Sequence, residues 1–164
     1  MSKAVMLSIR PKWCEKIASG EKTIEVRKAR PKLGTPFKVY IYCTQSGVAL
    51  GAWGKYGKVI GEFTCDRIYW LAPLNNAPDD VEQQACLTRE EIVRYLKGVG
   101  YGWHISDLKI YDKPKELAEF HTLEKCKSCS KSGYESTACI YDENCIVPVA
   151  ITKAPQSWFY VEEG

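Results

Sequence analysis

Short runs of hydrophobic residues, interrupted every few positions by polar ones, predict a chain built mainly of strands. Runs rich in β-branched and aromatic residues are typical of buried strands, whereas the alternation around Ile24 and Val26 is typical of a half-buried one. The predicted strands cover residues 5–9, 23–28, 37–44, 58–70, 101–111, 146–151 and 158–161.

Two segments carry the signals of short helices. Residues 12–19 follow Pro11 and end at Gly20, with proline at the start and glycine just past the end. Residues 88–91, Thr-Arg-Glu-Glu, match a capping box that opens a helix through about Leu96. About six short strands, two or more short helices and the absence of a βαβ repeat predict an α+β fold around a small curved sheet or β-barrel.

The composition limits the class of protein. The 164 residues fit one domain that is long enough to bury its own core. A hydrophobic content of 45% and a charged content of 26% are ordinary for a globular protein. No apolar run approaches the roughly 20 residues that cross a bilayer, and the first residues lack a signal peptide's apolar stretch. We therefore expect a single domain over residues 1–164, cytoplasmic and without a membrane partner.

The charge is unevenly distributed along the chain. The net charge is +3, but residues 1–38 hold ten Lys and Arg against three Glu and so carry +7. The remaining 126 residues therefore sum to −4. A basic block of this kind favours a polyanionic partner if it gathers on one face, and the alternative is an ordinary solvated surface.

Residues 20–27, Gly-Glu-Lys-Thr-Ile-Glu-Val-Arg, join the first helix to the second strand. Because side chains alternate along a strand, Glu25 and Arg27 share the face opposite to the two apolar residues, together with Thr23. There the carboxylate and the guanidinium can pair, and Lys22 at the bend can reach the same place. We expect these charges at the mouth of a cleft; the alternative is an exposed surface ion pair.

This segment resembles the signature of the ASCH domains, a branch of the PUA-like β-barrel superfamily. The four fixed positions of Gly-x-Lys-x-x-Glu-x-Arg are occupied here by Gly20, Lys22, Glu25 and Arg27. The opening strand and helix, beginning at residues 7–11, and the strand at residues 57–63 are also similar to that family. The resemblance covers residues 4 to about 120, with the C-terminal strand joining the same barrel. It implies a small PUA-like β-barrel whose cleft, beside the first helix, binds RNA or a nucleotide.

The same resemblance implies an enzymatic alternative. Some bacterial relatives are amidohydrolases that remove the acetyl group from acetylcytidine with a lysine, a threonine and a glutamate. By position their lysine corresponds to Lys22, while their threonine falls at Glu25, with Thr23 nearby. A partly buried lysine can act as a nucleophile or a base, but a neighbouring glutamate favours its charged form. If the chain is an enzyme, it is a nucleoside amidohydrolase with Lys22 and Glu25 as catalytic residues.

A nucleic-acid ligand needs cations for its phosphates and aromatic faces for its bases. Arg10 and Lys12 are the candidates for phosphate contacts. Trp103 and Trp158 are the preferred stacking walls, because both lie beside small residues at strand ends. The full set of predicted ligand-binding residues is Arg10, Lys12, Lys22, Thr23, Glu25, Arg27, Trp103 and Trp158.

Eight cysteines divide into two groups of four. The scattered ones are expected to be small buried hydrophobes: Cys14, Cys43, Cys65 and Cys86. The clustered ones lie within twenty residues: Cys126, Cys129, Cys139 and Cys145. Because the first two have the spacing of a zinc knuckle, the polar insertion at about residues 121–147 is predicted to hold a structural zinc, with disulfides or unmodified thiols as alternatives. We expect no organic cofactor.

Three functions therefore follow from the sequence, in order of preference. The first is binding of RNA or a nucleotide in the cleft lined by Lys22, Glu25 and Arg27. The second is the amidohydrolase acting on an acylated or modified nucleoside. The third is a protein-interaction module that uses the cysteine-rich insertion and the glycine-rich residues 45–57, with an unknown protein partner.

Overall fold

The computed structural model describes residues 3–45, 56–71, 76–126 and 145–164. This part of the chain contains ten strands, three α-helices and a turn of 3-10 helix, which confirms a mixed α+β fold. The strands are β1 (Lys3–Ile9), β2 (Ile24–Arg27), β3 (Phe37–Cys43), β4 (Lys58–Cys65), β5 (Ile68–Trp70), β6 (Tyr101–His104), β7 (Ser106–Lys115), β8 (His121–Lys125), β9 (Ile146–Ala150) and β10 (Trp158–Glu162). The helices are α1 (Pro11–Ala18), α2 (Val81–Ala85) and α3 (Arg89–Leu96), and the 3-10 turn is η2 (Leu117–Glu119).

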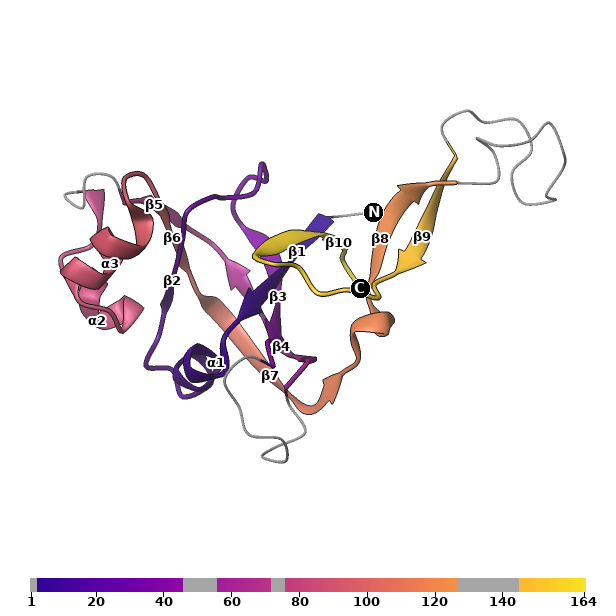
Figure 1. Ribbon diagram of the computed structural model, residues 1–164, viewed down its shortest axis with the longest axis horizontal. Coiled ribbons are helices and arrows are strands. Elements are labelled where there is room, and N and C mark those ends of the chain that lie inside the picture. Colours follow the sequence, from indigo (N-terminus) through magenta and orange to yellow (C-terminus); the bar gives the residue numbers. More distant parts are fainter. Residues whose placement is uncertain (1–2, 46–55, 72–75, 127–144) are drawn as a thin grey trace, which may run out of the picture.

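The described strands form three sheets (Figure 1). The largest has the order β10-β1-β3-β4-β7, with β1 parallel to β3 and its other pairs antiparallel. A small sheet has the order β2-β6-β5, and β8 pairs with β9 in a hairpin that extends away from the body. The large sheet stays open within the described residues, because β7 and β10 are its two edges and do not pair with each other.

Two of the predicted strands are divided between sheets. The strand predicted over residues 58–70 breaks at Asp66 and Arg67, so that β4 belongs to the large sheet and β5 to the small one. Likewise, β6 and β7 separate at Ile105 and join different sheets. Because apolar residues continue on both sides of each break, hydrophobicity alone does not reveal the change of sheet. The strands are accordingly shorter and more numerous than the sequence predicted.

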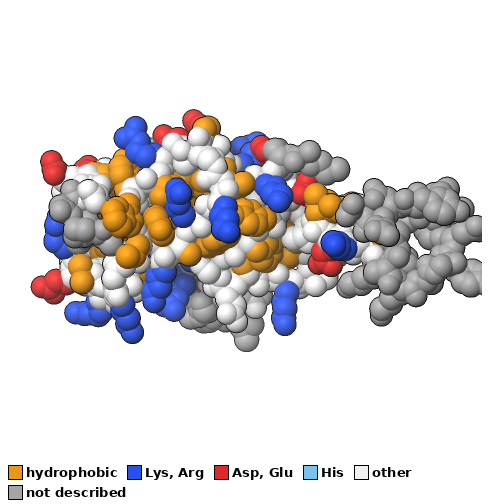
Figure 2. Space-filling model, turned by 90° about the horizontal axis from the view of Figure 1, so that it is seen from above, with side chains coloured by type: hydrophobic (Ala, Val, Ile, Leu, Met, Phe, Trp, Pro, Cys, Tyr) orange, Lys and Arg blue, Asp and Glu red, His pale blue; other side chains and the backbone are white. Residues whose placement is uncertain are grey.

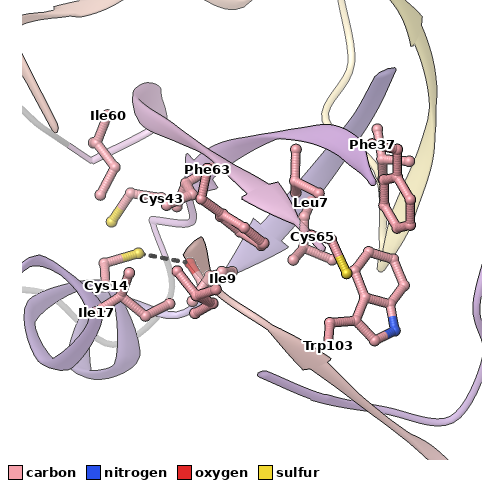
Figure 3. Close-up of a cluster of buried hydrophobic side chains, with 14 residues drawn as sticks. Leu7, Ile9, Cys14, Ile17, Phe37, Cys43, Ile60, Phe63, Cys65 and Trp103 are labelled. Carbon is pink, nitrogen blue, oxygen red and sulfur yellow. Dashed lines mark hydrogen bonds between the residues drawn. The ribbon is translucent and has the colours of Figure 1, made fainter. Parts of the chain in front are cut away.

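The cores explain why β1 has apolar residues at four successive positions, 4–7, since both faces of the large sheet are covered. Leu7 and Ile9 point into a core that also contains Trp103 of the small sheet (Figure 3). Met6 faces a second core together with Phe120, which lies just before β8. The large sheet is therefore buried between the small sheet on one side and the C-terminal elements on the other.

Three of the four scattered cysteines lie in the first core, as predicted: Cys14, Cys43 and Cys65 (Figure 3). Burial raises the pKa of the Cys65 thiol to about 12, because removal from water disfavours the thiolate. Cys86 instead caps the end of α2 with a left-handed φ of 53° and is partly exposed.

The helices begin and end at the predicted signals. Pro11 is the first residue of α1, and Gly20 follows its end with a left-handed φ of 79°. At α3 the Glu91 N–H donates to the Thr88 hydroxyl at 3.2 Å, and the Glu91 carboxylate accepts from the Thr88 N–H at 2.8 Å. The predicted capping box is therefore confirmed. In the described ranges, no helix combines the length and apolar character needed to cross a membrane.

A third core orients β2. Ile24 and Val26 pack against α2 and α3 in a cluster that includes Ile92 and Leu96. Because neighbouring side chains of a strand point to opposite faces, the carboxylate of Glu25 emerges on the other side, toward the large sheet. This packing directs the charged residues of β2 away from the apolar side of α2 and α3.

Candidate functional site

A cleft of about 470 Å³ opens between α1, β2, α3 and the segment that precedes β10. Four residues predicted for a ligand site line it: Arg10, Lys22, Glu25 and Arg27. They reach it from different elements, because Arg10 directly precedes α1, Lys22 follows that helix, and the other two belong to β2. The cleft is therefore formed where the opening helix meets the small sheet.

Lys22 lies at the base of the cleft with 2% of its surface exposed. Its Nζ lies 5.0 Å from the ring centre of Trp13 on α1, within reach of a cation–π interaction. Nζ also donates to the carbonyl oxygen of Ala85 at 2.7 Å and lies 3.4 Å from Oε2 of Glu25. The ammonium thus connects α1, α2 and β2.

Glu25 is a buried carboxylate between two cations. Its Oε1 lies 3.0 Å from Nη2 of Arg27, while its other oxygen faces Lys22. Nη2 of Arg27 also donates to the carbonyl oxygen of Ser8 at 2.6 Å, and Nη1 donates to the Ser157 hydroxyl at 3.4 Å. The guanidinium therefore holds Glu25 in place and joins β2 to β1 and to the segment before β10.

Burial and the neighbouring carboxylate act on Lys22 in opposite directions. Removal from water disfavours the ammonium and lowers the pKa of Lys22 below its ordinary 10.5, while the negative charge of Glu25 limits that shift. The cleft therefore contains a lysine that is less basic than one in water and is still paired with a carboxylate.

The rim of the cleft carries a cation and two aromatic rings. Arg10 is exposed at the start of α1 and forms no ion pair with a carboxylate of the described residues. Trp13 is half-buried, and Tyr95 on α3 is 44% exposed. The rim thus offers an accessible guanidinium and aromatic surface above the buried charges.

Two predicted contact residues lie beside the cleft and do not line it. Lys12 is exposed, with its Nζ 4.7 Å from the ring centre of Trp13. The Thr23 hydroxyl donates to Oε1 of Gln84 at 3.2 Å and so faces α2. Because β2 begins one residue later, at Ile24, the strand alternation that predicted the orientation of Thr23 does not include it.

The two tryptophans predicted as stacking walls belong to an aromatic cluster of the core. Trp103 is 0% exposed and packs edge-on against Phe37, with ring centres 5.8 Å apart. Trp158 lies 6.1 Å from Trp103, is half-buried, and does not line the cleft. Trp103 therefore has no ring face available for a ligand, which corrects the prediction. Its place at a strand end did not reveal that the large sheet covers it.

Sequence patterns did not predict that α3 and the segment before β10 contribute to the cleft. Tyr95 follows Glu91 by one turn, so the two lie on the same side of α3, whose other side is buried through Ile92 and Leu96. Tyr95 could have been singled out from the sequence, because it is an aromatic residue on the polar side of an amphipathic helix. Gln156 reaches the cleft because β10 pairs with β1, a contact between distant residues that leaves no local pattern.

The β8–β9 hairpin leads into the cysteine-rich insertion. The Cys126 N–H donates to the carbonyl oxygen of Cys145 at 2.9 Å, so the first and last of the clustered cysteines are adjacent. Cys129 and Cys139 lie outside the described residues. Among the residues that are described, no group of three His, Cys, Asp or Glu is placed to hold a metal ion. The structural zinc stays a prediction.

Comparison with models of known protein families identifies the family of this chain. The model of the ASCH domain matches residues 7–146, which include α1, β2, α3 and the charged residues of the cleft. The chain belongs to the ASCH domain family. The match extends past the cysteine-rich segment of this ASCH domain as far as the first residue of β9. No curated protein matches the chain.

Solved structures of an ASCH protein from Zymomonas mobilis, ZmASCH, are similar to this ASCH domain. ZmASCH itself is 17% identical with a TM-score of 0.62, and the match covers 98% of this chain and 88% of that one. Two of its point mutants are also 17% identical. One mutant has a TM-score of 0.63, and the match covers 99% of this chain and 92% of that one. The other mutant has a TM-score of 0.62, and the match covers 98% of this chain and 89% of that one. This likeness shows the fold, a PUA-like α+β fold as the sequence resemblance implied.

Proposed function

We propose that this ASCH domain binds RNA or a nucleotide in the cleft built on Lys22, Glu25 and Arg27. The observation that carries the proposal is a buried carboxylate, held between two cations, that lines a cleft with an accessible arginine and two aromatic rings at its rim. Membership in the ASCH family supports RNA as the class of ligand.

The size of the cleft suits a nucleotide. Its volume of about 470 Å³ falls within the roughly 300–1,000 Å³ typical of small-molecule sites. Such sites combine apolar walls with a few fixed polar groups, and here Trp13 and Tyr95 accompany the buried charges. A base that enters the cleft would therefore contact aromatic surface and a fixed carboxylate together.

Each charged residue has a distinct role in this proposal. Arg10 binds a phosphate, because its guanidinium is exposed and has no carboxylate partner among the described residues. Glu25 accepts hydrogen bonds from the N–H groups on the edge of a base, since protein contacts to unpaired bases use those edges. Lys22 and Arg27 act as positioning residues, because each cation pairs with Glu25 and also donates to a backbone carbonyl oxygen.

The proposal is tested by titrating uridine monophosphate into the Arg10→Gln variant while tryptophan fluorescence is recorded. Loss of a charge-assisted hydrogen bond is worth about 1.5–3 kcal/mol, so affinity should fall at least about tenfold. The matched control is Arg67→Gln, which removes an exposed arginine that does not line the cleft and should bind as the wild type does. Equal affinities of the two variants, or no binding by the wild-type protein, would contradict the proposal.

An amidohydrolase acting on an acylated nucleoside is the second candidate, and the environment of Lys22 favours it. Burial lowers the pKa of Lys22, which increases the fraction of neutral amine available as a nucleophile or base. Glu25 opposes this effect, and the Nζ already donates to a backbone carbonyl. Release of acetate from acetylcytidine, abolished by Lys22→Gln, would establish this activity, and no release at high enzyme concentration would exclude it for that substrate.

A protein-interaction role remains the third hypothesis. The β8–β9 hairpin projects from the body in Figure 1 and exposes Leu123 and Ile146. Exposed apolar side chains on a projecting hairpin suit contact with another protein. This role predicts neither nucleotide binding nor hydrolysis, so the two experiments above also separate it from the first two functions.

A further inference from the structure

The segment after β2 carries three exposed cations at alternating positions, Lys28, Arg30 and Lys32. None of them forms an ion pair with a carboxylate in the described part of the chain. Residues 28–36 contain no Asp or Glu at all. These charges are therefore not neutralised locally, in contrast to the buried cations of the cleft.

The same cations lie beside tyrosine side chains from other elements. Nζ of Lys28 lies 5.3 Å from the ring centre of Tyr95. Cζ of Arg30 lies 5.9 Å from the ring centre of Tyr101, at the start of β6. We define the basic strip as the set Lys28, Arg30, Lys32, Tyr95, Tyr101 and Tyr160. β2 runs toward the top of Figure 1, and Figure 2 views the molecule from that side. On this face, Lys and Arg side chains are interleaved with hydrophobic ones.

The basic strip is continuous with the cleft. Tyr95 belongs to both, because it lines the cleft and also lies beneath Lys28. The strip ends at β10, where the backbone N–H of Lys32 donates to the Tyr160 hydroxyl at 2.7 Å. From Lys28 to Lys32 an extended chain spans up to about 14 Å. A ligand that ends inside the cleft leaves the far end of this strip without a contact.

We propose that the basic strip binds the sugar–phosphate backbone and neighbouring bases of a single-stranded RNA, one base of which occupies the cleft. This inference rests on the proposed function and specifies its ligand as a strand several nucleotides long. Lysine and arginine without carboxylate partners neutralise successive phosphates. The half-exposed tyrosine rings offer stacking surfaces that accept any base. The cleft therefore holds one nucleotide while the strip holds those that follow it.

The first measurement compares ligands of different length on the wild-type protein. Uridine monophosphate, a uridine trinucleotide and a uridine octanucleotide are titrated at one fixed salt concentration. Each stacked base contributes roughly fivefold or more, so the octanucleotide should bind at least about tenfold more tightly than the mononucleotide. Equal affinities for the three lengths would overturn the inference.

The second measurement uses the double variant Lys28→Gln/Arg30→Gln. It should bind the mononucleotide as the wild type does and should lose the gain in affinity for the octanucleotide. The slope of log affinity against log salt concentration should become shallower by about 1.4, because each lost phosphate contact on a single strand contributes about 0.7. Both residues are exposed, so the variant should fold, and its melting temperature verifies this.

The matched control is Lys109→Gln/Lys113→Gln, which removes two exposed charges from β7. Because β7 and β10 are opposite edges of the large sheet, these lysines lie far from the Tyr160 end of the strip. The control should keep both the octanucleotide affinity and the salt slope. If both double variants lose affinity equally, the strip has no specific role and the inference fails. If the mononucleotide binds and depends on Arg10 without any gain from length, the proposed function stands and the inference alone is wrong.

Discussion

Replacement of Glu25 by glutamine tests the electrostatic organisation of the cleft. The change keeps the shape of the side chain and removes a charge that lies 3.0 Å from Nη2 of Arg27 and 3.4 Å from Nζ of Lys22. At an effective dielectric constant of about 20, each of these attractions has a gross energy of about 5 kcal/mol. Removing one partner of a buried ion pair costs about 3–5 kcal/mol, since the remaining charge stays buried.

Lys22 limits the size of this loss. Without Glu25, Lys22 can be buried as the neutral amine instead of as an unpaired ammonium. Releasing its proton at pH 7 costs about 5 kcal/mol for a group whose ordinary pKa is 10.5, so the loss of stability cannot exceed this value. The amide oxygen of the new glutamine still accepts one hydrogen bond. We therefore expect Glu25→Gln to lower the free energy of unfolding by about 3 kcal/mol at pH 7.

The loss should depend on pH in a defined direction. In the variant, the pKa of Lys22 in the folded state falls further below its value in the unfolded chain. Between those two pKa values the unfolded chain binds more protons than the folded one, so stability increases as the pH rises. The destabilisation caused by Glu25→Gln should therefore be smaller at pH 9.5 than at pH 7.

Urea unfolding followed by tryptophan fluorescence measures both effects. The control is Glu21→Gln, the same chemical change in an ion pair with Lys16 that is exposed to solvent. That variant should change the free energy of unfolding far less, because solvent screens exposed pairs. If Glu25→Gln is as stable as the wild type, or no less stable than Glu21→Gln, the assignment of Glu25 as a buried, doubly paired carboxylate is wrong.

Two further outcomes are expected. Thr88→Ala removes the hydroxyl that caps α3 and should lower the free energy of unfolding by about 1 kcal/mol in the same urea assay. Thr88→Ser keeps a hydroxyl and should be nearly neutral. An equal loss in both variants would contradict the capping role. Protein purified without added zinc should contain one zinc per chain by elemental analysis if the clustered cysteines bind the metal, and a metal content near zero together with reactive thiols in that cluster would exclude the site.

Local patterns predicted the elements that carry their own boundary signals. Pro11 and Gly20 mark the ends of α1, and the capping box at Thr88 marks the start of α3. Five-residue elements without such signals, α2 and β8, were not predicted, because each contains few apolar residues. The division of long apolar runs between two sheets depends on contacts between distant strands, which local hydrophobicity does not encode.

The residues of the candidate site also separate into those that local patterns predicted and those that they did not. Alternation along β2 was sufficient to place Glu25 and Arg27 on one face, since their orientation depends only on the burial of the residues between and beside them. The stacking surfaces were not predictable by the same reasoning. Trp103 lies opposite Glu25 in the strand register, yet the large sheet covers it, while Tyr95 on α3 lines the open cleft and stays 44% exposed. Which aromatic ring stays accessible is decided by the packing of whole elements.

A crystal structure of the protein with a bound uridine oligonucleotide tests the central claim most directly. The account predicts a phosphate within hydrogen-bond distance of the Arg10 guanidinium and the edge of a base within hydrogen-bond distance of the Glu25 carboxylate. A ligand bound on another face, with the space above Glu25 filled by solvent, would contradict it.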